Sequence, residues 1–283
     1  MIAVVFSGSR FSDWRLAEKR KIVTGFRMMG INPYLHDERF ILQLLNKNNN
    51  LINYAEKIRR IYFFGAGSSS PERKDKVASV LKQFFKNAKK IAVDHDVKAS
   101  AISTFGDGKG LIGILGSGSN AAYFNGRRTT DNNFGLGYIL ADEGSANWIG
   151  RMLLKSFLNE TMPEDLREKF VARYPLDRKV IMDKVYNQAN PTLFLTSFAD
   201  FVMENHKHRF VKKTICLGLK LYVETYLLPL TKQYPGATVN FTGSVAAGYE
   251  ECLREVAGKY GITIGTVIKE PIHNLLKYYL NKN

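Results

Sequence analysis

The sequence predicts an α/β fold made of two similar halves. Two apolar, strand-like segments, 2–6 and 110–115, are each followed by a Ser-Gly-Ser turn and then by a further strand-like segment. Helices and more strands are expected after each of these units. Because the same unit occurs twice, we predict a duplicated α/β domain, and 283 residues are enough for two domains with buried cores.

The first half alternates strands with helices. Serines at the cap position, Pro71 in the first turn and an early acid, Glu72, indicate where one helix begins. Before and after this helix, apolar runs and their periodicity predict strands at 13–17, 21–24, 60–64 and 91–93, a helix over 40–51, and another helix starting near Asp96.

The second half is expected to be richer in helix. A strand over 121–124 leads into Asn125-Gly126, a two-residue hairpin signal. Apolar residues at helical spacing then continue from about 144 to 234. The remaining elements are strands at 238–241 and 262–268, a helix between them, and a last helix from Pro271.

Composition restricts the class of protein. The net charge of +15 is compatible with anionic partners such as nucleotides, although a solvated basic surface is the favoured explanation because the lysines and arginines are scattered. No RNA-binding or zinc-finger signature is present, so nucleic acid is not an expected partner. The sequence has no apolar run long enough to span a bilayer and no secretion signal, which predicts a cytoplasmic protein without membrane contact.

The two cysteines, Cys216 and Cys252, lie far apart in helix-like segments. No pattern of paired cysteines or histidines surrounds them. We therefore expect reduced thiols, with neither a disulfide nor a structural zinc site.

Three glycine turns have the composition of phosphate-binding loops. They are Ser7-Gly8-Ser9, Gly116-Ser-Gly118-Ser119 and Thr242-Gly243-Ser244. Glycine lets the backbone approach a phosphate, and successive N–H groups can bind its oxygens. None is a P-loop, and each is also compatible with an ordinary hairpin or strand–helix junction.

Several polar residues stand at strand ends, where each has two interpretations. Asp96 is either a helix N-cap or a general base that takes a proton from a substrate hydroxyl. Asn32 is either a turn residue or an amide that binds sugar hydroxyls. Asp142 and Glu143 either complement the helix that follows or bind a polyol.

Taken together, these motifs resemble N-acetylglucosamine kinases of the BadF/BadG/BcrA/BcrD ATPase group. The resemblance rests on their order along the chain: Ser7-Gly-Ser…Asp13-Trp14, Gly30-Ile-Asn-Pro33, Gly65-Ala-Gly…Pro71, Asp96, Gly116-Ser-Gly-Ser-Asn120, Gly137…Ser145 and Gly243-Ser-Val-Ala246. It implies the actin-like ATPase fold, in which two ribonuclease-H-like domains surround a central cleft. We expect an N-terminal domain of 1–97 plus 270–283 and a C-terminal domain of 98–269 with a helical insertion.

The resemblance also implies roles for individual residues. Asp96 matches the catalytic base that deprotonates the sugar 6-hydroxyl. The positions in or beside the sugar site are Asn32, Ser117, Asn120, Asp142, Glu143 and Ala146. Those in the ATP site are Gly8 and Ser9 in the first phosphate turn, Gly116 and Gly118 in the second, and Gly243 and Ser244 at the adenosine.

The first turn departs from the family pattern. Phe6 replaces the Asp that helps to hold Mg²⁺, while Arg10 and Phe11 replace a Thr and a Lys. Ala141 stands where glycine is usual. Phenylalanine cannot bind Mg²⁺, so the expected cofactors are ATP and a weakened Mg²⁺ site. Arg10 could bind the phosphates in compensation, or Phe6 and Phe11 simply pack and the turn binds nothing.

Three functions follow from this pattern. The first is an ATP-dependent kinase for N-acetylglucosamine or a related amino sugar, slowed by the loss of the Asp. The second is a degenerate kinase, a pseudokinase that binds an amino sugar as a sensor or scaffold. The third is a basic protein that binds an anionic polymer. A homodimer is left open, since no residue pattern specifies one.

Overall fold

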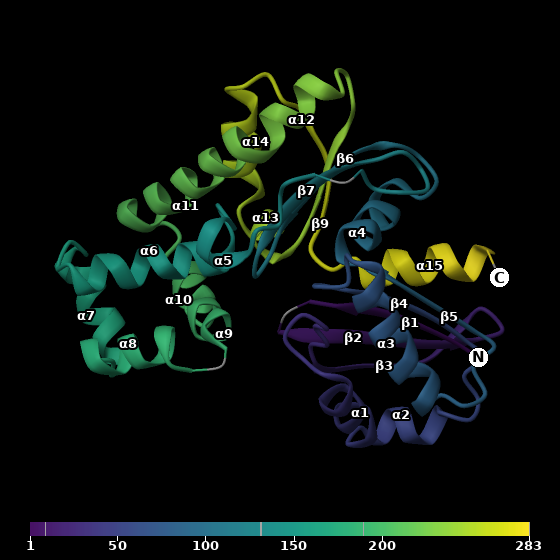
Figure 1. The fold of residues 1–283 in the computed structure, drawn as a ribbon. Coiled ribbons are helices and arrows are strands. Elements are labelled where there is room, and N and C mark those ends of the chain that lie inside the picture. The colour runs from purple at the N-terminus through teal and green to yellow at the C-terminus, as the bar shows by residue number, and fades with distance from the viewer. Residues whose placement is uncertain (9, 131, 189, 283) are drawn as a thin grey trace. The chain divides into compact units, whose positions relative to one another are not determined.

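The computed structural model describes residues 1–8, 10–130, 132–188 and 190–282. By packing, the chain forms two compact units (Figure 1). The first comprises Met1–Gly110, Phe124–Thr130 and Glu270–Asn283, and the second Leu111–Tyr123 and Asp131–Lys269. These are packing units, and the domain boundaries expected from the sequence stay a prediction. Each unit is described by itself.

The first unit contains a five-stranded sheet. Its order is β3 (Lys21–Met29), β2 (Phe11–Glu18), β1 (Ile2–Ser7), β4 (Arg60–Gly65) and β5 (Lys90–His95). The strands β1, β4 and β5 are parallel, and β2 and β3 continue the sheet antiparallel. Because parallel strands end at the same edge, Ser7, Gly65 and His95 form one row there.

Helices cover both faces of this sheet. Figure 1 shows α15 (Ile272–Lys282) on one side of the strands, and α1 (Glu38–Asn46) and α2 (Asn49–Tyr54) on the other. The helix α4 (Asp96–Phe105) packs with α15, whereas α3 (Pro71–Phe84) packs with α1. The single helix expected over 40–51 is wrong: the Asn48 side chain accepts a hydrogen bond from Leu51 N and begins a second helix.

The core of the first unit is centred on Trp14. Its side chain is fully buried on β2 and stacks on Phe26 of β3, with ring centroids 6.1 Å apart. Its indole N–H donates to Ser12 Oγ over 3.1 Å, which satisfies the one polar atom of the ring. This packing fixes the β1–β2 hairpin that carries the first glycine turn.

The second unit repeats the order of the first. Its sheet runs β7 (Ser119–Phe124), β6 (Gly110–Leu115), β8 (Val239–Thr242) and β9 (Ile264–Ile268), with β6, β8 and β9 parallel. This is the order β2-β1-β4-β5 over again. The predicted α/β duplication is therefore confirmed.

Among the described residues, the second sheet has no counterpart of β3. The chain does turn after β7, where Asn125 N donates to Arg128 O over 3.1 Å. The returning segment, however, pairs only through one isolated bridge between Phe124 and Thr129. The chain thus reverses at the predicted Asn125-Gly126, where the Asn125 side chain accepts from the N–H groups of both Arg127 and Arg128.

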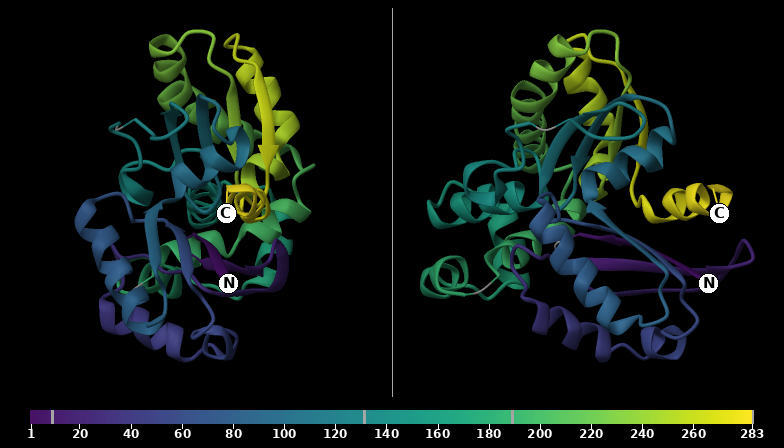
Figure 2. Two further views of the ribbon diagram at one scale, coloured as in Figure 1. Left: turned by 90° about the vertical axis from the view of Figure 1, so that its right-hand side faces the viewer. Right: turned by 45° about the vertical axis from the view of Figure 1, so that its right-hand side comes forward.

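Most of the second unit is helical, as expected. Between β7 and β8 lie α5 (Gly137–Leu140), α6 (Ala146–Leu158), α7 (Glu164–Arg173), α8 (Arg178–Tyr186), α9 (Pro191–Thr196), α10 (Ala199–Glu204), α11 (Arg209–Tyr222), the π-helix η1 (Val223–Leu227) and α12 (Leu228–Gln233). Two more, α13 (Ser244–Gly248) and α14 (Glu250–Gly258), connect β8 to β9. Figure 2 shows these elements in two further views.

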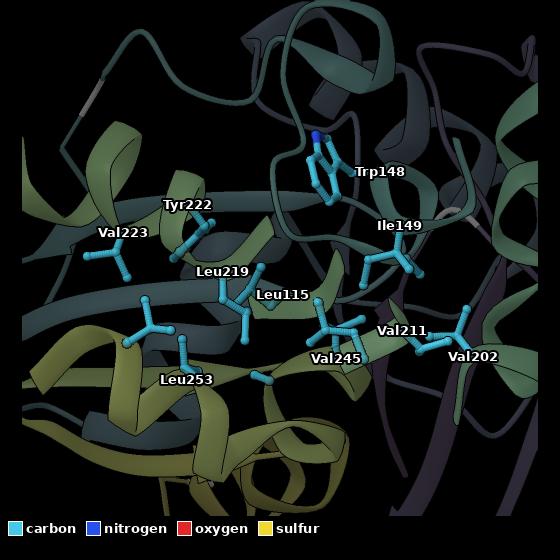
Figure 3. Packing of buried hydrophobic residues seen from close by; sticks show 14 of the residues in the cluster. Leu115, Trp148, Ile149, Val202, Val211, Leu219, Tyr222, Val223, Val245 and Leu253 are labelled. Atoms are coloured by element: carbon cyan, nitrogen blue, oxygen red, sulfur yellow. The ribbon is translucent and has the colours of Figure 1, made fainter. Parts of the chain in front are cut away.

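One continuous apolar cluster holds the second unit together. Figure 3 shows its side chains meeting between β6, α6, α11 and the segment of α13 and α14, with Leu115, Ile149, Leu219 and Val245 among them. These side chains come from segments far apart in the sequence. Burial of such side chains stabilises by about 1.5–3 kcal/mol each.

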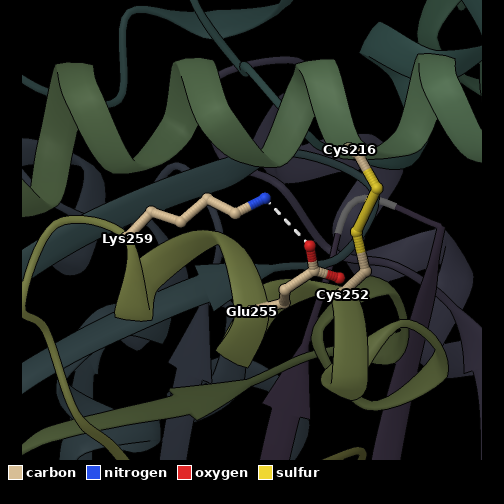
Figure 4. The surroundings of a disulfide bond; sticks show 4 residues. All are labelled: Cys216, Cys252, Glu255 and Lys259. Carbon is tan, nitrogen blue, oxygen red and sulfur yellow. Dashed lines mark hydrogen bonds and ion pairs between the residues drawn. A yellow bond between two sulfur atoms is a disulfide. The ribbon is translucent and has the colours of Figure 1, made fainter.

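The two cysteines, which lie far apart in the sequence, are neighbours in the structure. The packing of α11 on α14 brings the Cα atoms of Cys216 and Cys252 to 6.4 Å, and the two form a disulfide (Figure 4). The prediction of reduced thiols is therefore wrong for this structure. The reason is tertiary: the two residues are separated by 36 positions, and only helix packing makes them neighbours.

Within the described residues, no helix is both long enough and apolar enough to cross a membrane.

Candidate functional site

In the first unit, Ser7 fixes two predicted site segments at the end of β1. Its hydroxyl donates to Ile31 O over 3.0 Å and accepts from Ile31 N over 2.8 Å. The Ser7 side chain thereby makes the two hydrogen bonds to the Ile31 backbone, next to Asn32, that a neighbouring strand would make. Gly8 follows directly, so the first turn and the Asn32 loop start from the same point.

Asn32 is buried and its position is determined by the loops around it. Its Oδ1 accepts from Tyr34 N over 3.0 Å, as expected for a turn residue. A side chain at Gly67, which has a φ of +77°, would overlap this same oxygen. Glycine at 67 therefore leaves the space that Asn32 occupies.

Asp96 is the first residue of α4, directly after the end of β5. Its Oδ1 accepts from Val97 N over 3.0 Å, at the positive end of the helix dipole. The neighbouring His95 Nε2 lies 3.0 Å from Thr129 Oγ1, and burial lowers the pKa of this histidine. The imidazole is therefore neutral at neutral pH.

Asp94, two residues earlier, has a different environment from Asp96. Burial raises its pKa, but hydrogen bonds from Lys74 over 2.7 Å and Lys98 over 2.6 Å outweigh this effect and lower it. The two ammonium groups keep Asp94 ionised and use both of its carboxylate oxygens.

The first turn closes through Gly8 N, which donates to Phe11 O over 2.9 Å. Arg10 extends from this turn, and its guanidinium carbon lies 4.9 Å from the centre of the Phe11 ring. The predicted phosphate-binding residue Ser9 lies outside the described residues. The arrangement leaves an exposed cation at the turn.

The residues around Phe6 do not fit a Mg²⁺ site. Phe6 lies opposite Asp13 on β2, and Asp13 in turn lies opposite Arg27 on β3. Arg27 donates to Asp13 over 2.7 Å and to Glu270 over 2.6 Å, so both acids are paired with a cation. No group of three potential metal ligands occurs among the described residues.

In the second unit, the turn at Gly116–Gly118 is fastened to the start of α6. Ala146 N donates to Gly116 O over 2.9 Å, and Asn147 N donates to Ser117 O over 3.2 Å. Within the turn, Gly116 N donates to Gly118 O over 3.0 Å. The predicted residues Gly116, Ser117, Gly118 and Ala146 thus form one connected structure.

Asp142 connects this turn to the following helix. Its carboxylate accepts from Ser119 N over 2.8 Å and from Asn147 Nδ2 over 2.7 Å. Its backbone is in the left-handed region, at φ +67°, and burial raises its pKa. Asn147 Oδ1 is buried without a hydrogen-bond partner in the described chain.

Gly243 lies against the same turn. Its φ of +120° suits only glycine, and a side chain here would overlap the carbonyl of Leu115. Since β8 is the parallel neighbour of β6, Gly243 and Ser244 follow the strand end beside Gly116. The structure therefore brings together the second phosphate turn and the predicted adenosine loop.

Two tyrosines complete this half of the site. Tyr222 donates to the carbonyl of Asn120 over 2.8 Å, and Tyr226 donates to Glu143 Oε2 over 2.7 Å. Neither tyrosine was predicted, and neither was Asn147. Both tyrosines lie about a hundred residues beyond the motifs that they contact, and no local pattern in the sequence indicates them.

The predicted residues therefore fall into two groups. Gly8, Arg10, Asn32 and Asp96 lie at or beside the carboxyl ends of the strands in the first unit. In the second unit the structure brings together the rest: Gly116, Ser117, Gly118, Asn120, Asp142, Glu143, Ala146, Gly243 and Ser244. In open sheets with parallel strands, ligands bind at such carboxyl ends. The roles of the single residues stay predictions.

Comparison with known proteins agrees with this geometry. No family model matches the chain, and no curated protein does either. Among solved structures, a proposed N-acetylglucosamine kinase from Porphyromonas gingivalis is 33% identical, with a TM-score of 0.92 and 99% of both chains covered. A proposed N-acetylglucosamine kinase from Chromobacterium violaceum shares the fold at 13% identity, with a TM-score of 0.71 and 98% of both chains covered.

The fold also extends to more distant sugar kinases. A glucokinase of the ROK family from Streptomyces griseus has a TM-score of 0.60 at 10% identity, with 98% of this chain and 97% of that chain covered. The first similarity, at 33% identity over nearly the whole chain, shows common descent. The chain therefore belongs to the N-acetylglucosamine kinase-like family of the actin-like ATPase superfamily.

Proposed function

We propose that this protein is an ATP-dependent sugar kinase that transfers the γ-phosphoryl group of ATP to the 6-hydroxyl of N-acetylglucosamine or a related amino sugar. One observation carries the proposal. In the second unit, hydrogen bonds join the glycine turn to Asp142, Tyr226 links Asp142 to Glu143, and a second glycine loop packs against the turn. Phosphate and polyol groups are what such elements bind.

Asp96 supplies the base for this reaction. Its carboxylate stands at the start of α4, directly after β5, and would receive the proton of the attacking hydroxyl. The hydroxyl oxygen then bonds to the γ-phosphorus while the bond to the β-phosphate oxygen breaks and ADP leaves. A positioned base of this kind contributes about 10²–10⁴-fold in rate.

Phosphate charge is neutralised by the chain's own groups in this proposal. The N–H groups of the glycine turns would bind phosphate oxygens, and Arg10 would supply a cation from the exposed turn after β1. In the structure Arg10 lies over the Phe11 ring, so binding would require it to leave that contact.

The second candidate is a sugar-binding protein without turnover. Phe6 favours it, because no carboxylate stands at the end of β1 and Asp13 is already paired with Arg27. Loss of one element that stabilises charge typically costs about 10²–10³-fold in rate. Such a protein would keep the sugar site of the second unit and act as a sensor or scaffold.

Calorimetric titration distinguishes these candidates. The protein is titrated with N-acetylglucosamine and then with ATP and Mg²⁺, and ADP is measured after mixing. The kinase predicts binding of both compounds and production of ADP, which Asp96→Asn lowers by about 10²–10⁴-fold without weakening sugar binding. Sugar binding without ADP production supports the second candidate. The absence of binding to both compounds contradicts both candidates.

A further inference from the structure

The two acids of the second unit differ in what a ligand can reach. Among residues 141–150, every residue is buried except Glu143, which is half-buried. Asp142 uses both carboxylate oxygens on Ser119 N and Asn147 Nδ2. Asp142 therefore holds the turn, whereas Glu143 is partly exposed to solvent.

Glu143 is held by one residue from a distant helix. Tyr226 donates to its Oε2 over 2.7 Å, and the same hydroxyl accepts from Asp142 N over 3.3 Å. In the described chain, Glu143 Oε1 has no hydrogen-bond partner. Tyr226 thus uses one carboxylate oxygen and leaves the other to receive donors from a ligand.

The position of Tyr226 depends on an irregular helix. Tyr226 lies in η1, where Leu228 N bonds to Val223 O, five residues back rather than four. Pro229 explains the wide turn, because it has no N–H to donate and its ring would collide with the carbonyl four residues earlier. Wide turns of this type occur often at functional sites.

Packing restricts the tyrosine ring further. Tyr226 is 1% exposed, and Phe134 meets its ring edge-on with centroids 4.9 Å apart. Burial raises the pKa of Tyr226, and the bond to Glu143 raises it further, so the hydroxyl keeps its proton and acts as the donor. The direction of the hydrogen bond is thereby fixed.

We infer that Tyr226 is a positioning residue for substrate: it orients Glu143 so that the free carboxylate oxygen receives the hydroxyl groups of a pyranose sugar. The inference rests on the proposed function. The two acids then have different roles: Asp142 holds the phosphate turn, and Glu143 binds the sugar. The π-helix then has a function, which is to place Tyr226 against Glu143.

The test is a double-mutant cycle on sugar binding, with calorimetry and steady-state kinetics on the whole chain. Tyr226→Phe is expected to raise the Kd and KM for N-acetylglucosamine about tenfold and to change kcat and the Kd for ATP less than threefold. In the Glu143→Ala background, Tyr226→Phe should have no further effect on sugar binding, since Tyr226 acts through Glu143.

A matched control is present in the same unit. Tyr260 donates to Glu224 Oε1 over 2.6 Å, which is the same kind of tyrosine–glutamate bond made to an acid that is not a predicted site residue. Tyr260→Phe should leave the Kd for the sugar within twofold of wild type. If Tyr226→Phe does not fold, as judged by thermal unfolding, Glu143→Ala alone tests the inference and should weaken sugar binding at least tenfold.

The outcomes separate the inference from the proposed function. A wild-type protein that binds no amino sugar overturns the proposed function and the inference with it. A wild-type protein that binds the sugar, combined with folded Tyr226→Phe and Glu143→Ala variants that bind it equally well, overturns the inference alone. Equal effects of Tyr226→Phe in both backgrounds would show that the tyrosine acts without Glu143.

Discussion

Phe6 on β1 lies directly opposite Asp13 on β2, in the row of paired residues that continues to Arg27 on β3. Side chains of directly opposed residues share one face of the sheet, with Cβ atoms about 4.5–5.5 Å apart. A carboxylate at position 6 would therefore stand beside Asp13, which Arg27 already neutralises. Beside the predicted first phosphate turn, β2 carries one acid, Asp13, which is paired with Arg27, and the neighbouring strand β1 carries no acid.

Phe6→Asp tests whether the rest of the turn is intact. The change should raise the affinity for ATP in the presence of Mg²⁺ at least tenfold, because Mg²⁺ needs one or two carboxylates beside phosphate oxygens. It should also lower the free energy of unfolding by about 1–3 kcal/mol, since it removes apolar contacts and places two acids together. Titration with ATP, with and without Mg²⁺, measures the gain.

Phe6→Asn is the control for Phe6→Asp, since it has the same size as Asp without the charge. Equal ATP affinity of the two variants would mean that position 6 does not face the metal and that the motif was aligned wrongly.

Alanine variants of the two glycines in the second turn form a matched pair that tests the predicted phosphate site. A Cβ at Gly116 meets no atom within 4 Å, whereas one at Gly118 lies 3.0 Å from Asp142 Oδ1. Gly116→Ala should leave thermal unfolding unchanged and weaken ATP binding about tenfold if phosphate occupies the open space. Gly118→Ala should lower the melting temperature, because the Asp142 carboxylate must move. Unchanged ATP binding in a folded Gly116→Ala variant would place the phosphates elsewhere.

Stability should depend on pH through Asp94. Lys74 and Lys98 keep its folded pKa below the ordinary value of about 3.9, so its ionised form stabilises the protein above that pH. This contribution disappears as the pH falls through the folded pKa. Lys98→Met should lower the free energy of unfolding at pH 7 by about 1 kcal/mol and move acid unfolding to higher pH.

Lys89→Met serves as the control for Lys98→Met, because its ammonium pairs with no carboxylate in the described chain. Identical acid unfolding of both variants would show that Asp94 does not contribute.

The disulfide makes a separate prediction. Cys216–Cys252 closes a long loop, and such a bond stabilises by about 2–4 kcal/mol, mainly through the unfolded state. A reducing agent should therefore lower the free energy of unfolding by this amount. The double variant Cys216→Ser/Cys252→Ser should unfold at the reduced protein's midpoint and show no response to the reducing agent. A wild-type protein that is insensitive to reduction would contradict the bond.

Local signals in the sequence were sufficient for the strands and for the duplication. The apolar segment before each Ser-Gly-Ser turn predicted β1 and β6, because a buried parallel strand is apolar along its whole length. The cap at Ser70 and Pro71 likewise located α3, where the Ser70 side chain accepts from Arg73 N. These features depend on neighbouring residues only.

Tertiary contacts could not be predicted in the same way. Tyr226 reaches Glu143 across 83 positions, and Cys216 meets Cys252 only because α11 packs on α14. The break between α1 and α2 was missed because Asn48 was interpreted as part of one apolar helical pattern, while its side chain caps a new helix. In the site, motif order identified Asp142, but only the structure showed that its carboxylate binds the turn.

Because the described part of the second sheet has no third antiparallel strand, β7 is an edge strand, which affects how other protein molecules can bind to it. An edge strand exposes unpaired backbone groups to which another protein molecule can add a strand. Here the Asn132 amide donates to the carbonyl of Ala121 on β7 over 2.7 Å, so a side chain occupies one position that a foreign strand would need. The segment freed from sheet formation supplies Phe134, which packs on Tyr226. This departure from exact duplication therefore blocks one backbone acceptor on the edge of β7 and places an aromatic contact on Tyr226.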